Sequence, residues 1–462
     1  MVSDDTVYGV LLVFSVAFGL YTKNLKGADT RQTVSSIAGF CTILIICHLH
    51  VFHSIITVIG TCVVLKCVPH RKCHIACFIW SFGYLAVFRT VHLLGIPAPP
   101  PLCNAVQLFL TLRMIGLAFE IHDSRMAVFK EDATQEEKRL IKKYVHIDPD
   151  FSDIFSYAYC YIGMMTGPYY KYRTYQDWLE ETNMENIATH TPFWKKVKPV
   201  PIILACFLAF SHYFNIQYVE SDEFSDHPFW FRLFYMVPMF IIFRTRLYIA
   251  WLLSECMCIT SALGAYPVKS KPKCGQGPTD LKALEEIQNE PDKKSIEYNF
   301  QSVYNLDIYG CELATTTREG LRSWNMTVQY WLATYIHRRI PASLKAYRVS
   351  ITMGVSAFWH GIHPGYYLSF LTVPPILMAE AAMSNAFRRE ASPRQLWLFD
   401  WGCWFFKMRG FDYMCMGFLL LRLNSTLNYW WSIYFAGHVV VVLFLVIGNV
   451  FMKKKGSEVK KD

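Results

Sequence analysis

One histidine stands out as a polar group at the end of an apolar stretch. His360 follows about ten mainly apolar residues and precedes Pro364 and Gly365, which break a helix. Desolvation disfavours the charged form of a buried imidazole, so His360 is expected to be neutral and able to accept a proton as a general base. A core histidine that bonds to a neighbouring helix explains the same pattern equally well, and both interpretations stay open on these residues alone.

A second polar candidate is Asn325, in the sequence Ser323-Trp324-Asn325-Met326-Thr327. Asn325-Met326-Thr327 has the form of a glycosylation sequon, but the charge pattern described below places it on the cytosolic side, where that modification is absent. Taken alone, Asn325 is best explained as a structural residue.

Metal chemistry is weakly indicated. Cys67, His70, Cys73, His74 and Cys77 have ligand types at zinc-like spacing. Arg71 and Lys72 lie in the middle of this stretch, and their positive charge opposes a cation. We therefore predict no metal site. The chain also lacks the short motifs of soluble hydrolases, nucleoside triphosphatases and proteases.

The amino-acid composition indicates which class of protein must position these residues. Of 462 residues, 53% are hydrophobic and only 18% are charged, against roughly 25% charged in an average soluble protein. This excludes a disordered chain and a small disulfide scaffold, and it predicts a membrane protein with many spans. The 15 cysteines lie mostly in apolar runs and are expected to be reduced. The net charge of +9 is dispersed in short clusters, so no nucleic acid partner is predicted.

Apolar runs predict an all-α membrane bundle of about eleven spanning helices, because a span needs about 20 mostly apolar residues. The runs lie at 6–22, 33–48, 51–65, 75–95, 102–119, 199–216, 230–264, 349–363, 366–384, 411–423 and 428–452. The run at 230–264 is long enough for one tilted helix or two. Every second connection is basic, which predicts a lumenal N-terminus and a cytosolic C-terminus.

The polar stretches complete the expected organisation, a single membrane domain over 1–462. Residues 124–150 are predicted to form a cytosolic amphipathic helix, 268–295 a mobile polar linker and 453–462 a cytosolic basic tail. Aromatic and basic residues mix in 298–348, which predicts helices that lie at the membrane interface.

Segment 151–168 is apolar, carries Asp153 and precedes a basic stretch. It is predicted to enter the membrane and return without crossing it.

Taken together, Asn325 and His360, 35 residues later, resemble the signature of the membrane-bound O-acyltransferase (MBOAT) family. Longer strings look like one branch, the lysophosphatidylinositol acyltransferases of phospholipid remodelling. These strings are residues 165–175, 264–267, 363–370 and 412–418. The resemblance covers nearly the whole chain, except the 268–295 linker and the C-terminal tail.

The resemblance implies a buried catalytic chamber in an endoplasmic reticulum membrane protein. It implies transfer of a polyunsaturated acyl group, typically arachidonoyl, from coenzyme A to the sn-2 hydroxyl of lysophosphatidylinositol. His360 is then the base that takes the hydroxyl proton, and Asn325 donates its amide N–H to the reacting oxygen or orients the acceptor. Trp324 and Trp359 are candidate walls of the substrate pocket, although bundle packing explains them as well. Acyl-CoA is a co-substrate, and neither a cofactor nor a metal is implied.

Two alternatives remain beside this interpretation. The first is an MBOAT enzyme that acts on another lysophospholipid or on a protein. The second is a transporter that uses the buried histidine and asparagine as a polar pathway, although the sequence shows no inverted repeat. Competition among acceptors distinguishes the enzymes, and consumption of acyl-CoA distinguishes an enzyme from a transporter.

Overall fold

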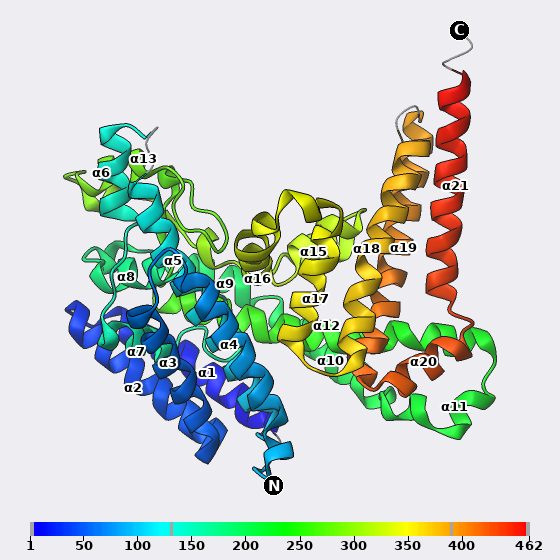
Figure 1. The fold of residues 1–462 in the computed structure, drawn as a ribbon, viewed down its shortest axis with the longest axis horizontal. Helices are drawn as coiled ribbons and strands as arrows, with labels where there is room; N and C mark the ends of the chain where they lie inside the picture. Colours follow the sequence, from blue (N-terminus) through cyan, green and yellow to red (C-terminus); the bar gives the residue numbers. More distant parts are fainter. Residues whose placement is uncertain (1–3, 130–132, 389–390, 459–462) are drawn as a thin grey trace. The chain divides into compact units, whose positions relative to one another are not determined.

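Helices make up nearly all of the regular structure of this chain, as Figure 1 shows. The computed structural model describes residues 4–129, 133–388 and 391–458. Residue contacts divide the chain into two units. The first unit comprises Met1–Pro201, Ile249–Leu306 and Asn325–Arg338, and the second comprises Ile202–Tyr248, Asp307–Trp324 and Arg339–Asp462. The single membrane domain expected over 1–462 stays a prediction.

In the first unit, α4 packs along α5, α3 along α4, and α2 along α7. Its helices are α1 (Asp4–Lys23), α2 (Ala28–Cys47), α3 (Val51–Cys67), α4 (Cys73–Thr90), α5 (Pro101–Val128), α6 (Gln135–Tyr144), α7 (Phe151–Tyr159), α8 (Tyr172–Glu180), α9 (His190–Val197), α13 (Leu281–Gln288) and α16 (Met326–Trp331). The strands β1 (Tyr266–Pro267) and β2 (Tyr298–Asn299) pair antiparallel, with Tyr266 opposite Asn299.

In the second unit, α18 packs along α17, α19 and α21. Figure 1 shows α18, α19 and α21 side by side. Its helices are α11 (Asp222–Asp226), α14 (Ile308–Leu313), α15 (Thr317–Ser323), α17 (Arg348–His360), α18 (Pro364–Phe387), α19 (Pro393–Leu420), α20 (Leu423–Ser432) and α21 (Ala436–Glu458). Two further helices, α10 (Val200–Tyr213) and α12 (Phe229–Thr260), have residues in both units.

Short turns connect these helices. A π-helical turn spans Leu332–Ile336. The 3-10 turns are His48–His50, Val91–Leu94, Met184–Asn186, Gln217–Glu220, Val268–Ser270, Lys293–Ser295, Gln301–Val303, His337–Arg339 and Ala342–Tyr347. Residues 298–348, expected to form interfacial helices, contain mainly short helices and turns, of which α15 has seven residues.

Seven helical segments in the described residues are long and apolar enough to cross a membrane, or eight if the bent pair α20 and α21 forms one span. The expected count of about eleven is therefore not reached. The runs at 33–48 and 51–65 fall in one segment, Ala28–Cys67, and the run at 349–363 is mostly α17, which has only 13 residues. The run at 411–423 is the end of α19, whose charged residues lower its hydropathy. The 230–264 run is one helix of 32 residues.

The predicted linker at 268–295 is folded where a mobile segment was expected. Its helix α13 packs on α6, where Leu284 joins Leu140 and Tyr144 in a small buried cluster. Arg139 and Lys143 of α6 both form ion pairs with Glu285 of α13. Apolar contact and opposite charge therefore give this polar segment a defined structure.

Two other polar segments differ in length from their predictions. The amphipathic helix expected over 124–150 is the ten-residue α6, which begins after a capping box between Thr134 and Glu137. Residues 130–132 lie outside the described part. The expected tail over 453–462 continues α21 as far as Glu458, and residues 459–462 lie outside the described part.

The segment at 151–168 begins with α7, whose nine residues extend about 14 Å and cannot cross a hydrocarbon core of about 30 Å. The buried Arg113 of α5 donates hydrogen bonds to the carbonyls of Tyr157 and Cys160, at 3.1 and 3.0 Å. These bonds satisfy backbone groups where the helix ends. Its entry into the membrane stays a prediction.

Candidate functional site

Asn325 occupies an unusual backbone position at the start of α16. Its φ of 47° and ψ of 53° place it in the left-handed region, which asparagine tolerates better than most residues. Its carbonyl accepts hydrogen bonds from the N–H groups of Val328 and Gln329, both at 3.0 Å. The side-chain oxygen, Oδ1, is buried and has no hydrogen-bond partner among the described residues. The amide is therefore not used as a helix cap.

Asn305 fixes the chain around Asn325. Its backbone oxygen accepts from the N–H of Met326 at 2.8 Å. Its side-chain oxygen accepts from both the N–H and the hydroxyl of Thr327, at 3.1 and 2.6 Å. The hydroxyl oxygen of Thr327 accepts in turn from the N–H of Tyr169 at 2.9 Å. Both residues after Asn325 are thus bonded to buried neighbours.

A buried ion pair supports Asn305. Glu255 Oε1 accepts from the N–H groups of Asn305 and Leu306, at 2.8 and 2.9 Å. Glu255 Oε2 lies 2.5 Å from the ammonium of Lys196, which also lies 4.0 Å from the centre of the Tyr304 ring. Glu255 is fully buried, and a buried carboxylate persists only when it is paired and hydrogen-bonded. Lys196, Glu255, Asn305 and Thr327, called the polar network here, hold the Asn325 loop within the first unit.

His360 is held by aromatic rings in the second unit. It is the last residue of α17, and α18 starts four residues later at Pro364. The imidazole centre lies 5.1 Å from the rings of Phe370 and Phe418, which come from α18 and α19. Because three helices contribute to these contacts, packing of α17, α18 and α19 determines where the imidazole lies.

A close backbone approach brings α18 and α19 together beside this histidine. The N–H of Gly365 donates to the carbonyl of Leu421 at 2.8 Å. A Cβ added to Gly365 would lie 2.2 Å from the carbonyl oxygen of Gly417, closer than any side chain allows. Glycine at 365 therefore permits the contact that positions the start of α18.

Trp324 directly precedes Asn325 and Trp359 directly precedes His360, and both tryptophans belong to the second unit. Trp324 packs on the ring of Phe243, which lies 5.1 Å from Phe418, itself in contact with His360. Trp359 is buried beside His360, with ring centres 4.6 Å apart. Trp324 and Trp359 are thus parts of one aromatic cluster, and a role in substrate binding stays a prediction.

The two candidate catalytic residues belong to different units, Asn325 to the first and His360 to the second. Their joint action stays a prediction. One of the points where the chain passes from one unit to the other is the peptide bond between Trp324 and Asn325.

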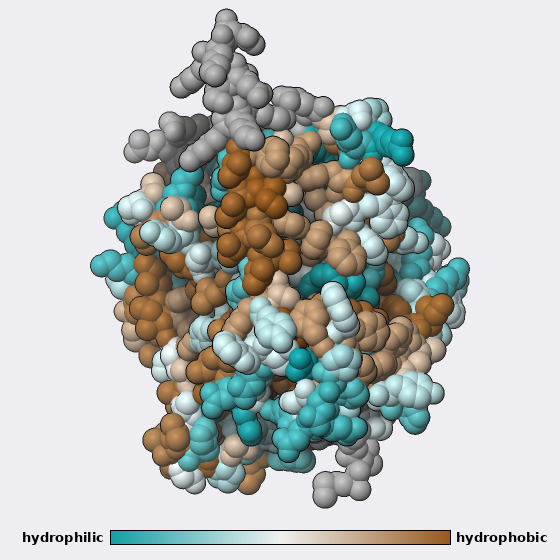
Figure 2. All heavy atoms as spheres, turned by 90° about the vertical axis from the view of Figure 1, so that its right-hand side faces the viewer, coloured by the Kyte–Doolittle hydropathy of each residue, from teal (hydrophilic) through white to brown (hydrophobic). Residues whose placement is uncertain are grey.

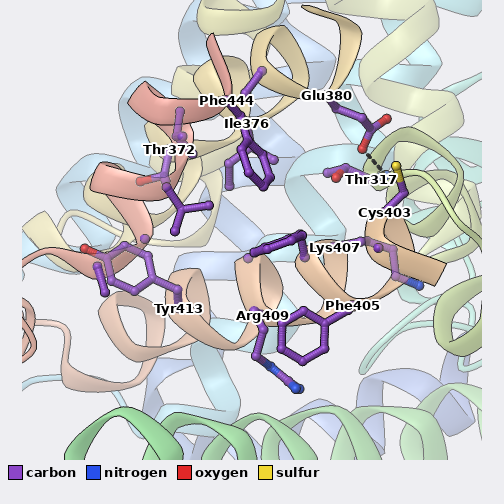
Figure 3. Close-up of a pocket in the computed structure, with 18 of the residues that line it drawn as sticks. Thr317, Thr372, Ile376, Glu380, Cys403, Phe405, Lys407, Arg409, Tyr413 and Phe444 are labelled. Carbon is purple, nitrogen blue, oxygen red and sulfur yellow. Dashed lines mark hydrogen bonds between the residues drawn. The ribbon is translucent and has the colours of Figure 1, made fainter. Parts of the chain in front are cut away.

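The second unit also contains a largely apolar cavity of about 510 Å³, lined by α12, α18, α19 and α21 (Figure 3). Its charged lining residues have partners within the unit. Glu380 accepts from the N–H of Thr317 at 2.6 Å, as drawn in Figure 3, and Arg409 pairs with Asp412 at 2.6 Å. The ammonium of Lys407 donates to the carbonyl of Cys311 at 2.8 Å. With its charges engaged, the cavity offers mainly apolar surface.

Among the residues that the structure describes, no group of three or more histidine, cysteine or acidic side chains is placed to hold a metal ion. Cys73 and Cys77, from the zinc-like spacing, are buried free thiols.

Comparison with protein families gives a match to the model of MBOAT, the membrane-bound O-acyltransferase family, over residues 31–420. The chain belongs to this family. It is a multi-pass membrane protein, and the resemblance seen in Asn325 and His360 is confirmed at the level of the family.

Similar proteins cover the chain from end to end. One is the membrane-bound acylglycerophosphatidylinositol O-acyltransferase mboat7 of Xenopus laevis, 43% identical over 98% of this chain and 95% of that protein. MBOAT7 of Homo sapiens, described in the same words, is 41% identical over 97% of this chain and 94% of its own length. The protein frj of Drosophila melanogaster, also so described, is 33% identical over 96% of this chain and 92% of its own length.

Sequence reasoning missed the residues that hold the Asn325 loop. Glu255 had a visible signal, since it is a carboxylate inside the apolar run from Trp251 to Ile259. Asn305 and Lys196 had none, because they lie in polar stretches and meet Glu255 only in the folded chain.

Proposed function

We propose that this protein transfers an acyl group from coenzyme A to the sn-2 hydroxyl of lysophosphatidylinositol. The observation that carries the proposal is its similarity, over nearly its whole length, to proteins described as acylglycerophosphatidylinositol O-acyltransferases. The Asn325 and His360 motifs support it, because both residue types suit acyl transfer.

His360 acts as the base in this proposal. Its imidazole takes the proton of the acceptor hydroxyl while the hydroxyl oxygen attacks the thioester carbonyl. Collapse of the tetrahedral intermediate breaks the carbon–sulfur bond, and the departing thiolate takes up a proton. No acyl-enzyme is needed, since the thiolate is a good leaving group. A positioned base typically contributes about 10²–10⁴-fold to the rate.

Asn325 stabilises the oxygen that gains charge, or orients the acceptor. Its buried Oδ1, which has no partner among the described residues, can accept a hydrogen bond from the acceptor hydroxyl and so supports the orienting role, and the polar network holds the backbone that follows Asn325. The role of the amide N–H as a donor to the reacting oxygen follows from the family resemblance. A positioned amide donor of this kind is worth about 2.7–4 kcal/mol in the transition state. Trp324 and Trp359 form part of the chamber wall.

The remaining parts of the proposal follow from the resemblance and the charge pattern. The protein resides in the endoplasmic reticulum membrane, with a lumenal N-terminus and a cytosolic C-terminus, and prefers arachidonoyl-CoA. Its spans and interfacial helices surround a buried chamber that receives both substrates. Antibody labelling of an epitope tag placed at each terminus, with and without permeabilisation, tests the topology.

The proposal is tested by acyl transfer with purified protein in detergent, given arachidonoyl-CoA and a mixture of lysophospholipids. Product confined largely to phosphatidylinositol, and lost in His360→Ala, supports acceptor and base together. His363→Ala is the matched control, because His363 lies three residues away, is exposed and should leave activity intact.

Other outcomes decide between the alternatives. Activity on another lysophospholipid or on a protein keeps the family and discards the acceptor. Movement of lipid without consumption of acyl-CoA indicates a transporter. Full activity in His360→Ala shows that another group takes the proton.

A further inference from the structure

A groove of about 580 Å³ lies along one face of α18 in the second unit. One wall is the α18 face from Pro364 to Pro375, and the other residues that line it include Leu423, Trp430 and His438. We call it the α18 groove. Residues three and four apart, such as Pro364, Leu368 and Leu371, form one continuous strip on a helix. The strip is about 16 Å long at 1.5 Å per residue.

The groove starts at the helix break that follows His360. Ile362, two residues after His360, and Pro364, the first residue of α18, both line it. A long ligand in the groove therefore has one end beside the break and its length along α18.

One residue of the lining has a side-chain hydrogen-bond donor without a partner among the described residues. Trp430 is 1% exposed, and its Nε1 has no hydrogen-bond partner among the described residues. One face of its indole is stacked on Tyr413, with ring centres 4.9 Å apart and an 8° angle between the rings. The Tyr413 hydroxyl bonds to His438 Nδ1 at 2.7 Å, which fixes the second ring and leaves His438 Nε2 for another partner. An indole N–H can only donate, so it suits an ester or phosphate oxygen.

Charge near the groove distinguishes between ligands. Among the described residues that line it there is no lysine, arginine or acidic residue, which disfavours the polyanionic head of coenzyme A as its occupant. Arg422, next to the lining residue Leu423, is exposed and makes no ion pair within the described residues. Its guanidinium suits one phosphate outside the apolar strip. Figure 2, a view of the side that is on the right in Figure 1, shows apolar side chains mainly in the upper half of this face and mixed polar and apolar side chains below.

We propose that the α18 groove seats the lysophospholipid acceptor, with its single acyl chain along α18 and its ester oxygen on Trp430 Nε1. The inference rests on the proposed function and adds the place where the acceptor binds. Trp430 and His438 act as positioning residues that hold the glycerol end of the lipid in the groove.

The first test is Trp430→Phe, which keeps an aromatic ring and removes the N–H. The KM for lysophosphatidylinositol should rise about three- to tenfold, the effect of one lost hydrogen bond, while the KM for acyl-CoA stays unchanged. Trp431→Phe is the matched control, because Trp431 is the next residue of α20 and is 73% exposed. Equal rises in both KM values, or no rise, overturn the proposal.

The second test fills the groove. Leu371→Trp should raise the KM for a long-chain acceptor more than tenfold and have less effect on a short-chain one. Leu398→Trp, at an exposed apolar position of α19 outside the lining, should change neither KM.

A third test, photolabelling, uses the wild-type protein and therefore does not depend on the folding of any variant. A diazirine-bearing lysophosphatidylinositol should label residues 364–375, and unlabelled lysophosphatidylinositol should compete. Labelling by a diacyl phospholipid that lysophosphatidylinositol does not displace shows a resident bilayer lipid and overturns the assignment.

The tests also separate this inference from the proposed function. A wild-type enzyme that acylates lysophosphatidylinositol, with normal KM values in both variants, overturns only the assignment of the groove as the acceptor site. A wild-type enzyme that does not acylate this lipid overturns the proposed function.

Discussion

The Asn325 loop and the His360 helix end are held by different kinds of interaction. In the first unit, the chain beside Asn325 is fixed by directional hydrogen bonds that lead through Asn305 to Glu255 and Lys196. In the second unit, His360 lies in ring contact with Trp359, Phe370 and Phe418, which come from three helices.

This difference predicts different responses to substitution. Removing one partner of a buried polar network leaves the other partner unpaired in a low-dielectric interior, at a large cost in stability. Replacing one ring of an aromatic cluster by a smaller side chain lets its neighbours relax and shifts the imidazole only slightly. Substitutions around Asn325 should therefore reduce stability sharply, and those around His360 should reduce turnover gradually.

The largest effect is expected for Glu255→Ala. The substitution leaves the Lys196 ammonium and two backbone N–H groups without their carboxylate, which should lower the free energy of unfolding by about 3–5 kcal/mol. Thermal unfolding in detergent measures it. Glu180→Ala, at an exposed position of the same unit, should leave the melting temperature almost unchanged.

Glu255→Gln sharpens this prediction. Its amide oxygen can still accept from Asn305 and Leu306, so it should be milder than Glu255→Ala. A glutamine variant as unstable as the alanine variant would show that the ion pair, and not the hydrogen bonds to the loop, dominates.

The second prediction separates the backbone role of Asn325 from its amide. Asn325→Ala and Asn325→Gly both remove the donor, so turnover should fall about 10²–10³-fold in each. Only alanine is strained at a φ of 47°, so it should be about 1–2 kcal/mol less stable than glycine. Kinetics and melting temperatures of both variants measure the two effects. Near-normal turnover in the glycine variant would show that the amide has no catalytic role.

The third prediction concerns the rings around His360. Phe370→Leu and Phe418→Leu should each lower kcat about two- to tenfold, with a small change in melting temperature, because each removes one ring contact worth about 0.5–1.5 kcal/mol. Phe451→Leu, far along α21, serves as the control. A wholesale loss of stability in either variant would mean that this cluster is as intolerant as the polar network.

The sequence predicted an all-α membrane protein and the family, because apolar runs and the paired Asn325 and His360 are local features of the chain. It predicted more spans than the seven or eight candidates among the described residues, because α17 is too short and charged residues along α19 lower the hydropathy of that helix. It also missed most of the polar network. Lys196 and Asn305 meet Glu255 across long separations in the chain, and no spacing rule connects them.

The smallest effect is expected for Glu285, whose ion pairs with Arg139 and Lys143 lie at the surface. They contrast with the pair of Glu255 and Lys196 in the polar network. Hydrogen bonds from Arg139 and Lys143 lower the pKa of Glu285, in the folded segment 268–295, to about 2 from an ordinary value of 4.5. A carboxyl whose folded-state pKa is lowered stabilises the fold above its unfolded pKa and loses that contribution as the pH falls through the folded value. Contact between α6 and α13 should therefore be unchanged from neutral pH down to about pH 5 and weaken only below about pH 4.5.

Hydrogen exchange of the α13 amides across this pH range measures that contact. Glu285→Gln should remove the acid dependence, speed exchange slightly at neutral pH and leave acyl transfer intact, since solvent and salt screen exposed charges. A loss of stability as large as that of Glu255→Ala would contradict the comparison, because it would mean that the exposed pair matters to the fold as much as the buried one.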